Sequence, residues 1–336
     1  MINAPVSLAA AAAMAASTQT RHFPQPRMKA LVREGGRVSV QLMQKPPLTD
    51  SRSVLIRVTL AGLCRTDLYA AEGRMKTCDP LVLGHEFSGI IEEVGAEVDG
   101  LRAGNRVTVN PLLPCETCRH CVAGFSGACQ NSTFLGVDRT GCFAHFICVP
   151  ARAVFRLADN VSDLAAAYAE PVAASLAVLK AGINTSDKVL IYGKNRFSQL
   201  LEKILQIHGI RHVTTHDTTT CTAVAEAGTF DCVVETMLNA KAFSEIVDAV
   251  RPGGKIVLKS RQFEPVPLLL TDLLKKEPIM HVVNYGPFDH ALRLLTGGKL
   301  HVEDLVDGVY RLEQYEQVMK TARNRESLKP FFAPWE

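Results

Sequence analysis

The stretch "LIYGKNRFSQLL", residues 190–201, decides how the second half of the chain is expected to fold. An apolar run typical of a buried strand leads into Gly193, and a run with helical spacing follows it. A strand, a glycine turn and a helix in this order open a dinucleotide-binding unit, whose fingerprint is G-x-G-x-x-G. Gly193 keeps the first glycine, whereas Asn195 and Ser198 stand at the second and third positions.

The two substitutions predict a weakened turn rather than a destroyed one. Asparagine is the non-glycine residue best suited to positive φ, so we expect that conformation at Asn195, at a cost of about 1 kcal/mol relative to glycine. Its side chain narrows the path of a pyrophosphate, while Ser198 is small enough for close helix packing. The helix N-terminus is still expected to attract an anion, with Lys194 and Arg196 flanking it.

An acidic residue follows the fingerprint at the expected distance. Asp217 ends "HVTTHD", near the point, about 20 residues further on, where a carboxylate binds the adenosine ribose and favours NAD over NADP. The stretch "THDTTTC" offers no arginine for a 2′-phosphate. The alternative is that Asp217 is a turn residue at a strand end.

The regions on either side of this stretch have different patterns. Residues 28–149 contain short β-like runs split by glycine and proline, beginning with "MKALV". A single alanine-rich helix is predicted over 162–182, with Ser162 as its N-cap and Gly182 as its end.

Beyond this helix, strands alternate with helices, which predicts a parallel sheet covered on both faces. The fold class is therefore α/β with two domains and an active site in the cleft between them. The nucleotide domain is a doubly wound parallel sheet (Rossmann) over 166–302. The catalytic domain is a mostly β, partly barrel-like unit over 28–165 and 303–336.

Composition excludes several classes of protein. The chain has 336 residues, 47% apolar and 21% charged, and its net charge of +3 is too small to indicate a nucleic-acid partner. No run reaches the roughly 18 apolar residues of a membrane span. The alanine-rich run near the start has no basic residue before it, so residues 1–27 are predicted to be a disordered leader and not a secretory signal.

Four cysteines form a dense cluster in "PCETCRHCVAGFSGAC". Their spacing, C-x2-C-x2-C-x7-C, predicts a structural zinc site closed by four thiolates in a lobe over 111–130. Incidental cysteines or an iron–sulfur cluster are the alternatives. Thiolates of this kind favour a reducing compartment, hence the cytoplasm. The four residues are Cys115, Cys118, Cys121 and Cys129.

A second, open metal site is predicted from scattered residues. The chain carries C-x-T-D at 64–67, G-H-E at 84–86 and Glu170 in "AYAEPVAASL". Taken singly, Cys64 is a buried small residue, His85 a turn residue and Glu170 a polar position on a helix. Together they supply sulfur, imidazole and carboxylate, a mixed set that suits catalytic zinc with room for substrate.

These motifs, with E-P-V-A at 170–173 and R-P-G-G at 251–254, resemble the zinc-dependent medium-chain alcohol and polyol dehydrogenases, in particular the sorbitol and threonine dehydrogenase branch. The resemblance covers nearly the whole chain from Met28 and implies a GroES-like catalytic domain. It also implies that Cys64 and His85 bind the catalytic zinc, with Glu86 and Glu170 as direct or exchanging ligands.

The resemblance further assigns the proton path and one cofactor contact. Thr66 matches the hydroxyl that relays the alcohol proton, but Tyr69 stands where several relatives have a histidine, which alters the outer path. Lys329 in "SLKPFF" matches the basic residue that reaches the pyrophosphate. His145 receives no role.

The function expected from these observations is reversible oxidation of a polar secondary alcohol to a ketone with NAD. The resemblance implies a polyol, cyclitol, sugar-like or amino alcohol as substrate, two zinc ions per chain, and a dimer or tetramer of identical chains. The principal alternative keeps zinc and the fold but has lost hydride transfer, acting as a lyase, an isomerase or a binding protein, with Arg196 and Phe197 filling the cleft. A non-enzymatic scaffold is disfavoured because the ligand set is intact.

Overall fold

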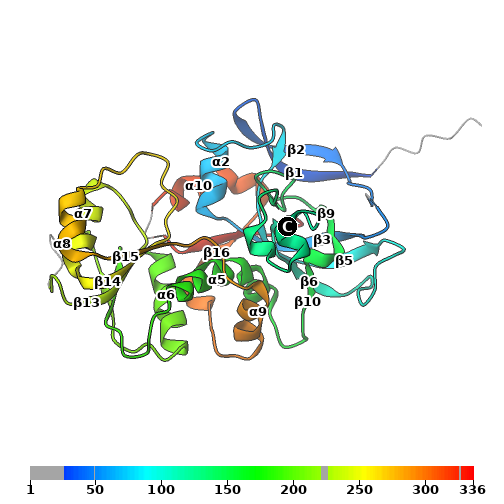
Figure 1. Cartoon of the computed structure of the whole chain (residues 1–336). Helices are drawn as coiled ribbons and strands as arrows, with labels where there is room; N and C mark the ends of the chain where they lie inside the picture. The colour runs from blue at the N-terminus through cyan, green and yellow to red at the C-terminus, as the bar shows by residue number, and fades with distance from the viewer. Residues whose placement is uncertain (1–25, 49, 221–225, 325–326) are drawn as a thin grey trace, which may run out of the picture.

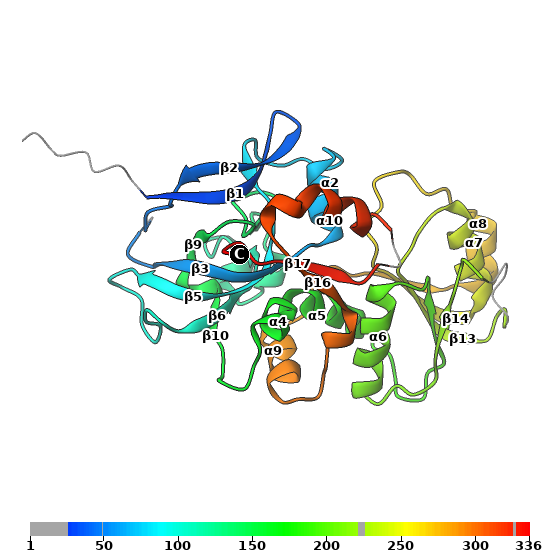
Figure 2. The ribbon, with the colours of Figure 1, turned by 180° about the vertical axis from the view of Figure 1, so that it is seen from behind.

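The computed structural model describes residues 26–48, 50–220, 226–324 and 327–336. Figure 1 shows a lobe formed mainly by blue and cyan segments and a second lobe formed mainly by yellow-green segments. Seen from behind, red segments from the end of the chain run between the two lobes (Figure 2). The predicted leader over 1–27 lies almost wholly outside the described residues.

One lobe contains a five-stranded sheet in the order β12-β11-β13-β14-β15, in which every pairing is parallel. Numbered along the chain, the strand order is 2-1-3-4-5. This is a doubly wound arrangement, in which the order of connection changes direction between the first strand, β11, and the third, β13. The predicted parallel sheet is confirmed. The strands are β11 (Val189–Tyr192), β12 (Val213–His216), β13 (Phe230–Glu235), β14 (Val250–Leu258) and β15 (Ile279–Val282).

Helices cover both faces of this sheet because side chains alternate along each strand. Val189 and Ile191 pack with the helices α6 and η3 on one face. Leu190 and Tyr192 pack with α7 and α8 on the other. The helices are η3 (Ala177–Ala181), α6 (Arg196–Ile207), α7 (Ala240–Ala249) and α8 (Leu270–Lys276).

The other lobe is built on a seven-stranded sheet, in which β3 pairs with β5, β9 and β17. The pairing with β17 brings the end of the chain beside a strand from its beginning. The sheet consists of β3 (Ser53–Gly62), β5 (Glu86–Val94), β6 (Arg106–Val109), β9 (Phe146–Pro150), β10 (Val154–Arg156), β16 (Val306–Tyr310) and β17 (Lys329–Phe332).

Smaller elements complete this lobe. No helix among the described residues is both long and apolar enough to cross a membrane. The remaining strands are β1 (Arg27–Glu34), β2 (Arg37–Gln44), β4 (Leu81–Val82), β7 (Leu112–Leu113) and β8 (Thr133–Phe134). The remaining helices are α2 (Arg65–Ala71), α3 (Arg119–Val122), η1 (Ser126–Ala128), η2 (Ala151–Ala153), α4 (Asp163–Ala167), α5 (Ala169–Leu176), α9 (Phe288–Thr296), η4 (Glu303–Leu305), η5 (Leu312–Gln314) and α10 (Tyr315–Ala322).

The single helix predicted over 162–182 is wrong, although both of its ends are right. Ser162 caps α4 by accepting a hydrogen bond from the backbone N–H of Ala165, and Gly182 ends η3 with φ of 63°. Between them the chain breaks at Tyr168. Pro171 explains the break, because its ring lacks an N–H and crowds the carbonyl four residues earlier.

The segment that precedes His85 is fixed by a close backbone approach. A Cβ atom on Gly141 would lie 2.2 Å from the carbonyl oxygen of Gly84, and Gly141 donates its own N–H to Val82. We expect Gly141→Ala to destabilise the fold by about 1–3 kcal/mol, because backbone atoms must move to admit the methyl group. Urea unfolding measures the loss.

Gly127→Ala is the matched control, because a Cβ atom there meets open space and the residue does not have positive φ. Equal unfolding midpoints for the two variants would contradict the account of Gly141.

Candidate active site

The buried carboxylate of Asp67 holds the two halves of the predicted metal site together. Its Oδ2 accepts the N–H of Cys64 at 2.8 Å, closing the start of α2. Its Oδ1 accepts the N–H of Gly84 at 3.1 Å and contacts Nδ1 of His85 at 3.1 Å. Because Nδ1 is engaged, Nε2 of His85 is left as the ligand atom. Asp67 is fully buried.

Three of the predicted ligands converge. One donor atom each from Cys64, His85 and Glu86 lies within 4.8 Å of the others. Glu86 Oε1 is buried and has no hydrogen-bond partner among the described residues, while Glu86 Oε2 pairs with the ammonium group of Lys329. A buried carboxylate oxygen without a partner is costly, so the site fits a cation that would bind it.

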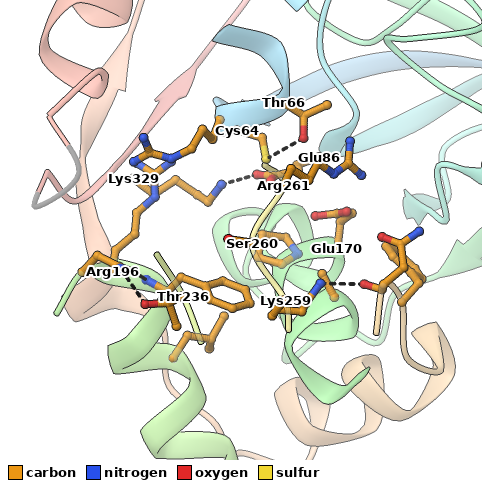
Figure 3. A pocket seen from close by; sticks show the side chains of 18 of the residues that line it. Cys64, Thr66, Glu86, Glu170, Arg196, Thr236, Lys259, Ser260, Arg261 and Lys329 are labelled. Atoms are coloured by element: carbon orange, nitrogen blue, oxygen red, sulfur yellow. Dashed lines mark hydrogen bonds and ion pairs between the residues drawn. The ribbon is translucent and has the colours of Figure 1, made fainter. Parts of the chain in front are cut away.

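Glu170 lies beside this group without belonging to it. It is buried and lines the same pocket as Cys64 and Glu86 (Figure 3). Burial, followed by the negative charge of Glu86, raises the pKa of Glu170 to about 7, although His85 and Lys329 partly offset the rise. Thr66 is also buried and lines the pocket, with its Oγ1 at 3.7 Å from the sulfur of Cys64.

Burial lowers the pKa of His85, but the charge and hydrogen bond of Asp67 act more strongly in the opposite direction. The net result is a pKa well above the usual value for histidine. The same carboxylate that orients the imidazole therefore also raises its basicity, which strengthens a metal ligand.

The four cysteine sulfurs also converge, as predicted from their spacing, and all four thiols are free. The sulfur of Cys118 lies 3.5 Å from Cys121 and 3.9 Å from Cys129, and the sulfurs of Cys115 and Cys129 are 3.5 Å apart. Zinc–sulfur bonds of about 2.3 Å in a tetrahedron imply sulfur separations of about 3.8 Å. These distances are too long for disulfides and fit one zinc ion. Backbone N–H groups of Thr117 and Cys118 lower the pKa of Cys115 to about 6.

The turn after β11 corrects one expectation. Gly193 has φ of 101°, and a Cβ atom there would lie 2.8 Å from the hydroxyl of Thr236. Asn195, expected at positive φ, has φ of −163° and is the N-cap of α6. Its Oδ1 accepts the backbone N–H groups of Phe197 at 2.9 Å and Ser198 at 3.1 Å.

This capping changes the predicted anion site. Two of the N–H groups that a helix N-terminus offers to a phosphate are here already bonded to the side chain of Asn195. Ser198, at the third position, is buried, and its hydroxyl accepts the N–H of Asn195 and donates to its carbonyl. An incoming phosphate would have to displace the amide of Asn195.

Arg196 and Lys329 both reach the segment before Cys64. The guanidinium of Arg196 donates to the carbonyl oxygens of Leu328 at 3.2 Å and Leu63 at 3.4 Å, so it links α6 to the other lobe. Lys329 also donates to the carbonyl of Leu63, at 3.4 Å. The structure thus brings Lys329, predicted to reach a pyrophosphate, into contact with Glu86 at the metal ligands.

Asp217 and Lys194 form a separate pair beyond the end of β12, with 3.3 Å between the lysine Nζ and a carboxylate oxygen. Hydrogen bonds from the hydroxyl and N–H of Thr219, and the charge of Lys194, hold the pKa of Asp217 well below its usual value. Asp217 is therefore ionised and also forms the turn considered above. Six residues were predicted to bind the cofactor. Of these, Asn195, Arg196 and Lys329 line the pocket, whereas Gly193, Lys194 and Asp217 do not.

Sequence reasoning missed several pocket residues. Lys259, directly after β14, donates to the carbonyl of Asn284 at 2.6 Å, and burial lowers its pKa to about 8. Burial, followed by the negative charges of Glu170 and Glu86, raises the pKa of Tyr285. The rule that ligands bind at the carboxyl ends of parallel strands would have located Lys259.

We expect Asp67→Asn to destabilise the protein by about 1–3 kcal/mol, because an amide cannot accept from all three of its present donors. Zinc should also dissociate more readily at a given chelator concentration, since His85 loses its orienting carboxylate. Urea unfolding and chelator titration measure the two effects. The control is Asp50→Asn, which changes an exposed carboxylate bonded to one backbone N–H. Equal effects of the two changes would refute the role given to Asp67.

Comparisons with known proteins agree with this geometry. Residues 50–159 match the alcohol dehydrogenase GroES-like domain. The chain is 27% identical over 342 residues to a sorbitol dehydrogenase from Halalkalibacterium halodurans, covering 91% of this chain and 99% of the relative. It is 29% identical over 272 residues to an L-threonine 3-dehydrogenase from Anaeromyxobacter dehalogenans, covering 72% and 79%.

Solved structures agree as well. Galactitol-1-phosphate dehydrogenase from Escherichia coli superposes with a TM-score of 0.79 at 26% identity, covering 91% of this chain and 100% of that one. A protein from Sinorhizobium meliloti 1021, described as a zinc-binding dehydrogenase and bound to NADP, gives 0.85 at 25% identity, covering 92% and 100%. With its parallel sheet, its GroES-like domain and its converging cysteine, histidine and glutamate, the chain is an alcohol dehydrogenase enzyme that belongs to the zinc-dependent medium-chain alcohol and polyol dehydrogenase family.

Proposed function

We propose that this enzyme interconverts a polar secondary alcohol and its ketone, using zinc and NAD(H). The observation that carries the proposal is a single pocket that joins the two halves of the required chemistry. Cys64 and Glu86 lie at one part of its wall, and Thr236, after a parallel strand, and Arg196, at the start of α6, lie at another (Figure 3). Dinucleotides bind at such strand ends.

Cys64, His85 and Glu86 would hold the zinc, with Glu170 as an exchanging ligand. Zinc bound there would supply a Lewis acid for the substrate oxygen. Thr66 is within reach of the same region and would hold the proton of the alcohol hydroxyl. Lys329 holds the carboxylate of Glu86 in place through their ion pair. The four-cysteine lobe would hold a second, structural zinc ion, giving two per chain.

The cofactor side of the proposal rests on Asp217 and on the similarity to the S. meliloti protein bound to NADP. NAD would accept or return the hydride. Gly193, Lys194, Asn195 and Arg196 are the residues proposed to contact its phosphates. The ionised carboxylate of Asp217 favours NAD over NADP, because it would accept hydrogen bonds from ribose hydroxyls and would repel a 2′-phosphate.

The substrate class is supported by the relatives. They are named for sorbitol, L-threonine and galactitol 1-phosphate, each of which has a secondary hydroxyl among other polar groups. The buried carboxylate of Glu170 beside the metal ligands is consistent with a polar substrate. We accordingly propose a polyol, cyclitol, sugar-like or amino alcohol.

A second candidate function is a zinc protein of the same fold without hydride transfer. Two observations favour it. Asn195 occupies N–H groups that a cofactor phosphate would use, and Arg196 crosses the cleft to the carbonyls of Leu63 and Leu328. A lyase, isomerase or binding protein would need no access for a dinucleotide at this turn.

We propose three further properties. The domain bounds are 28–165 with 303–336, and 166–302, consistent with the pairing of β17 with β3. Homo-oligomerisation, to a dimer or tetramer, is supported by the exposed side chains of Ile279 and Val282 on β15, the last strand of its sheet, of which Val282 is 83% exposed. The cytoplasm is proposed because the described cysteines are free thiols.

Metal analysis tests the ligand assignment. The purified protein should contain two zinc ions per chain, because each cluster offers a complete set of donors. Cys64→Ala should remove one of them and abolish oxidation of sorbitol. Cys118→Ser should remove the other and lower the unfolding temperature, since the lobe depends on its metal. Cys148→Ser, outside both clusters, is the control. One zinc ion in the wild-type protein, lost only in Cys118→Ser, would rule out the catalytic site.

Cofactor binding tests the redox proposal. NADH should bind the wild-type protein. The double substitution Asn195→Gly/Ser198→Gly should lower the dissociation constant for NADH about tenfold, because two helix N–H groups become available to phosphate. Fluorescence or calorimetric titration measures both constants. If wild-type protein shows no binding and the double variant restores it, the candidate without hydride transfer is favoured.

A further inference from the structure

Two cations that follow β14 closely in the sequence line the pocket. Lys259 and Arg261 both line it, near Glu170 (Figure 3). The ammonium group of Lys259 contacts the carbonyl oxygen of Asn284 at 2.6 Å. The guanidinium of Arg261 lies 6.0 Å from the centre of the Phe134 ring. Neither cation lies within ion-pair distance of a carboxylate in the part of the chain that the structure describes.

Their contacts place Arg261 near the metal ligands and Lys259 nearer the start of α6. The Phe134 ring contacted by Arg261 also packs against His85, with 5.1 Å between ring centres. Lys259 lies 5.7 Å from the centre of the Phe197 ring and next to Asn284. The pair therefore faces the space between the metal ligands and the start of α6, where the reacting carbon of a substrate must lie.

The charges of the pocket do not balance without a further anion. Lys329 is already paired with Glu86. The thiolate of Cys64 and the carboxylates of Glu86 and Glu170 are the anionic groups offered to a divalent metal, and together with Lys329 and that metal they sum to zero. Lys259 and Arg261, together with Arg65 and Arg196, are the cations of the pocket lining that lie outside this sum, so the pocket carries an excess of positive charge.

A neutral polyol does not need such a pair, because hydroxyl groups are satisfied by neutral donors and acceptors. Removing an ammonium group from water without a counter-charge costs free energy, which an anionic ligand recovers. The planar guanidinium matches the two oxygens of a carboxylate or a phosphate, and an ammonium group adds a point charge.

We propose that the substrate carries an anionic group, a phosphate or a carboxylate, that Lys259 and Arg261 bind while the metal site holds its alcohol oxygen. The inference rests on the proposed function for the reaction, but the anion site itself does not require hydride transfer. The substrate class becomes a polyol phosphate or a hydroxy acid of sugar size. Lys259 and Arg261 would then select it over the neutral polyol of the same length.

The test compares three probes of one chain length: D-sorbitol, D-sorbitol 6-phosphate and D-gluconate. Steady-state oxidation with NAD and calorimetric binding to the zinc-loaded protein, with and without saturating NADH, are measured for each probe. The variants are Lys259→Met, Arg261→Met and Lys259→Arg. Lys241→Met, an exposed lysine on α7 outside the pocket, is the matched control.

We expect kcat/KM for at least one anionic probe to exceed that for sorbitol by tenfold or more. Lys259→Met and Arg261→Met should each reduce the ratio of kcat/KM for the anionic probe to that for sorbitol at least tenfold, mainly through KM. Lys259→Arg should retain most of this ratio. Lys241→Met should leave the ratio as in the wild type. The probe that shows the preference, phosphate or carboxylate, identifies the anionic group.

The two proposals fail differently. If no probe is oxidised but an anionic probe binds more tightly than sorbitol through Lys259 and Arg261, hydride transfer is refuted and the anion site stands. If binding of the anionic probes disappears once NADH is present, the two cations serve the cofactor phosphates and the inference is overturned. It is equally overturned if sorbitol binds as tightly as both anionic probes, or if the Met variants weaken all three probes alike.

Discussion

The organisation of the active site depends on one buried carboxylate, that of Asp67. It fixes the N–H of Cys64 at the start of α2, the N–H of Gly84 and the imidazole of His85, although the two segments are far apart in sequence. A metal ligand needs an orienting partner, because a free side chain pays rotamer entropy when it binds. Asp67 is the partner of both Cys64 and His85. The close approach of Gly141 to the backbone of Gly84 further restricts the conformation of the segment that carries His85.

The sequence allowed much of this arrangement to be predicted, for identifiable reasons. The four-cysteine lobe depends on local spacing, and its sulfurs converge as expected. The parallel sheet follows from the alternation of apolar strands with helices. Ser162 begins α4 as its N-cap and Gly182 ends η3 as its C-cap, as the capping rules require. Cys64, His85 and Glu86 could be named together because of a resemblance. Spacing alone would have left them three unrelated residues.

Several features could not be predicted from the sequence, and the physical reason differs from one to the next. Asn195 was expected at positive φ because the glycine it replaces adopts it, but its amide instead bonds the N–H groups of its own helix and keeps an extended backbone. Lys329 was expected to reach a pyrophosphate, and its ion pair with Glu86 was not foreseen, because the two residues are far apart in the sequence. The position of Lys259 at the carboxyl end of a parallel strand was a signal for a pocket residue, but its contact with the carbonyl of Asn284 could not be read from the sequence, because Asn284 follows another strand. The long helix predicted over 162–182 is interrupted at Tyr168, because Pro171 disrupts the turn before it.

The carbonyl oxygen of Leu63 receives hydrogen bonds from two cations that serve different lobes, Arg196 at the start of α6 and Lys329 beside Glu86. Leu63 directly precedes Cys64, so its carbonyl oxygen connects helix α6 to the residue that carries the sulfur ligand. An anion that binds Arg196 would break one of the two hydrogen bonds to this oxygen. Binding of an anion in the pocket and the position of the loop that carries Cys64 are thereby coupled, because Arg196 must release a hydrogen bond to the residue before Cys64.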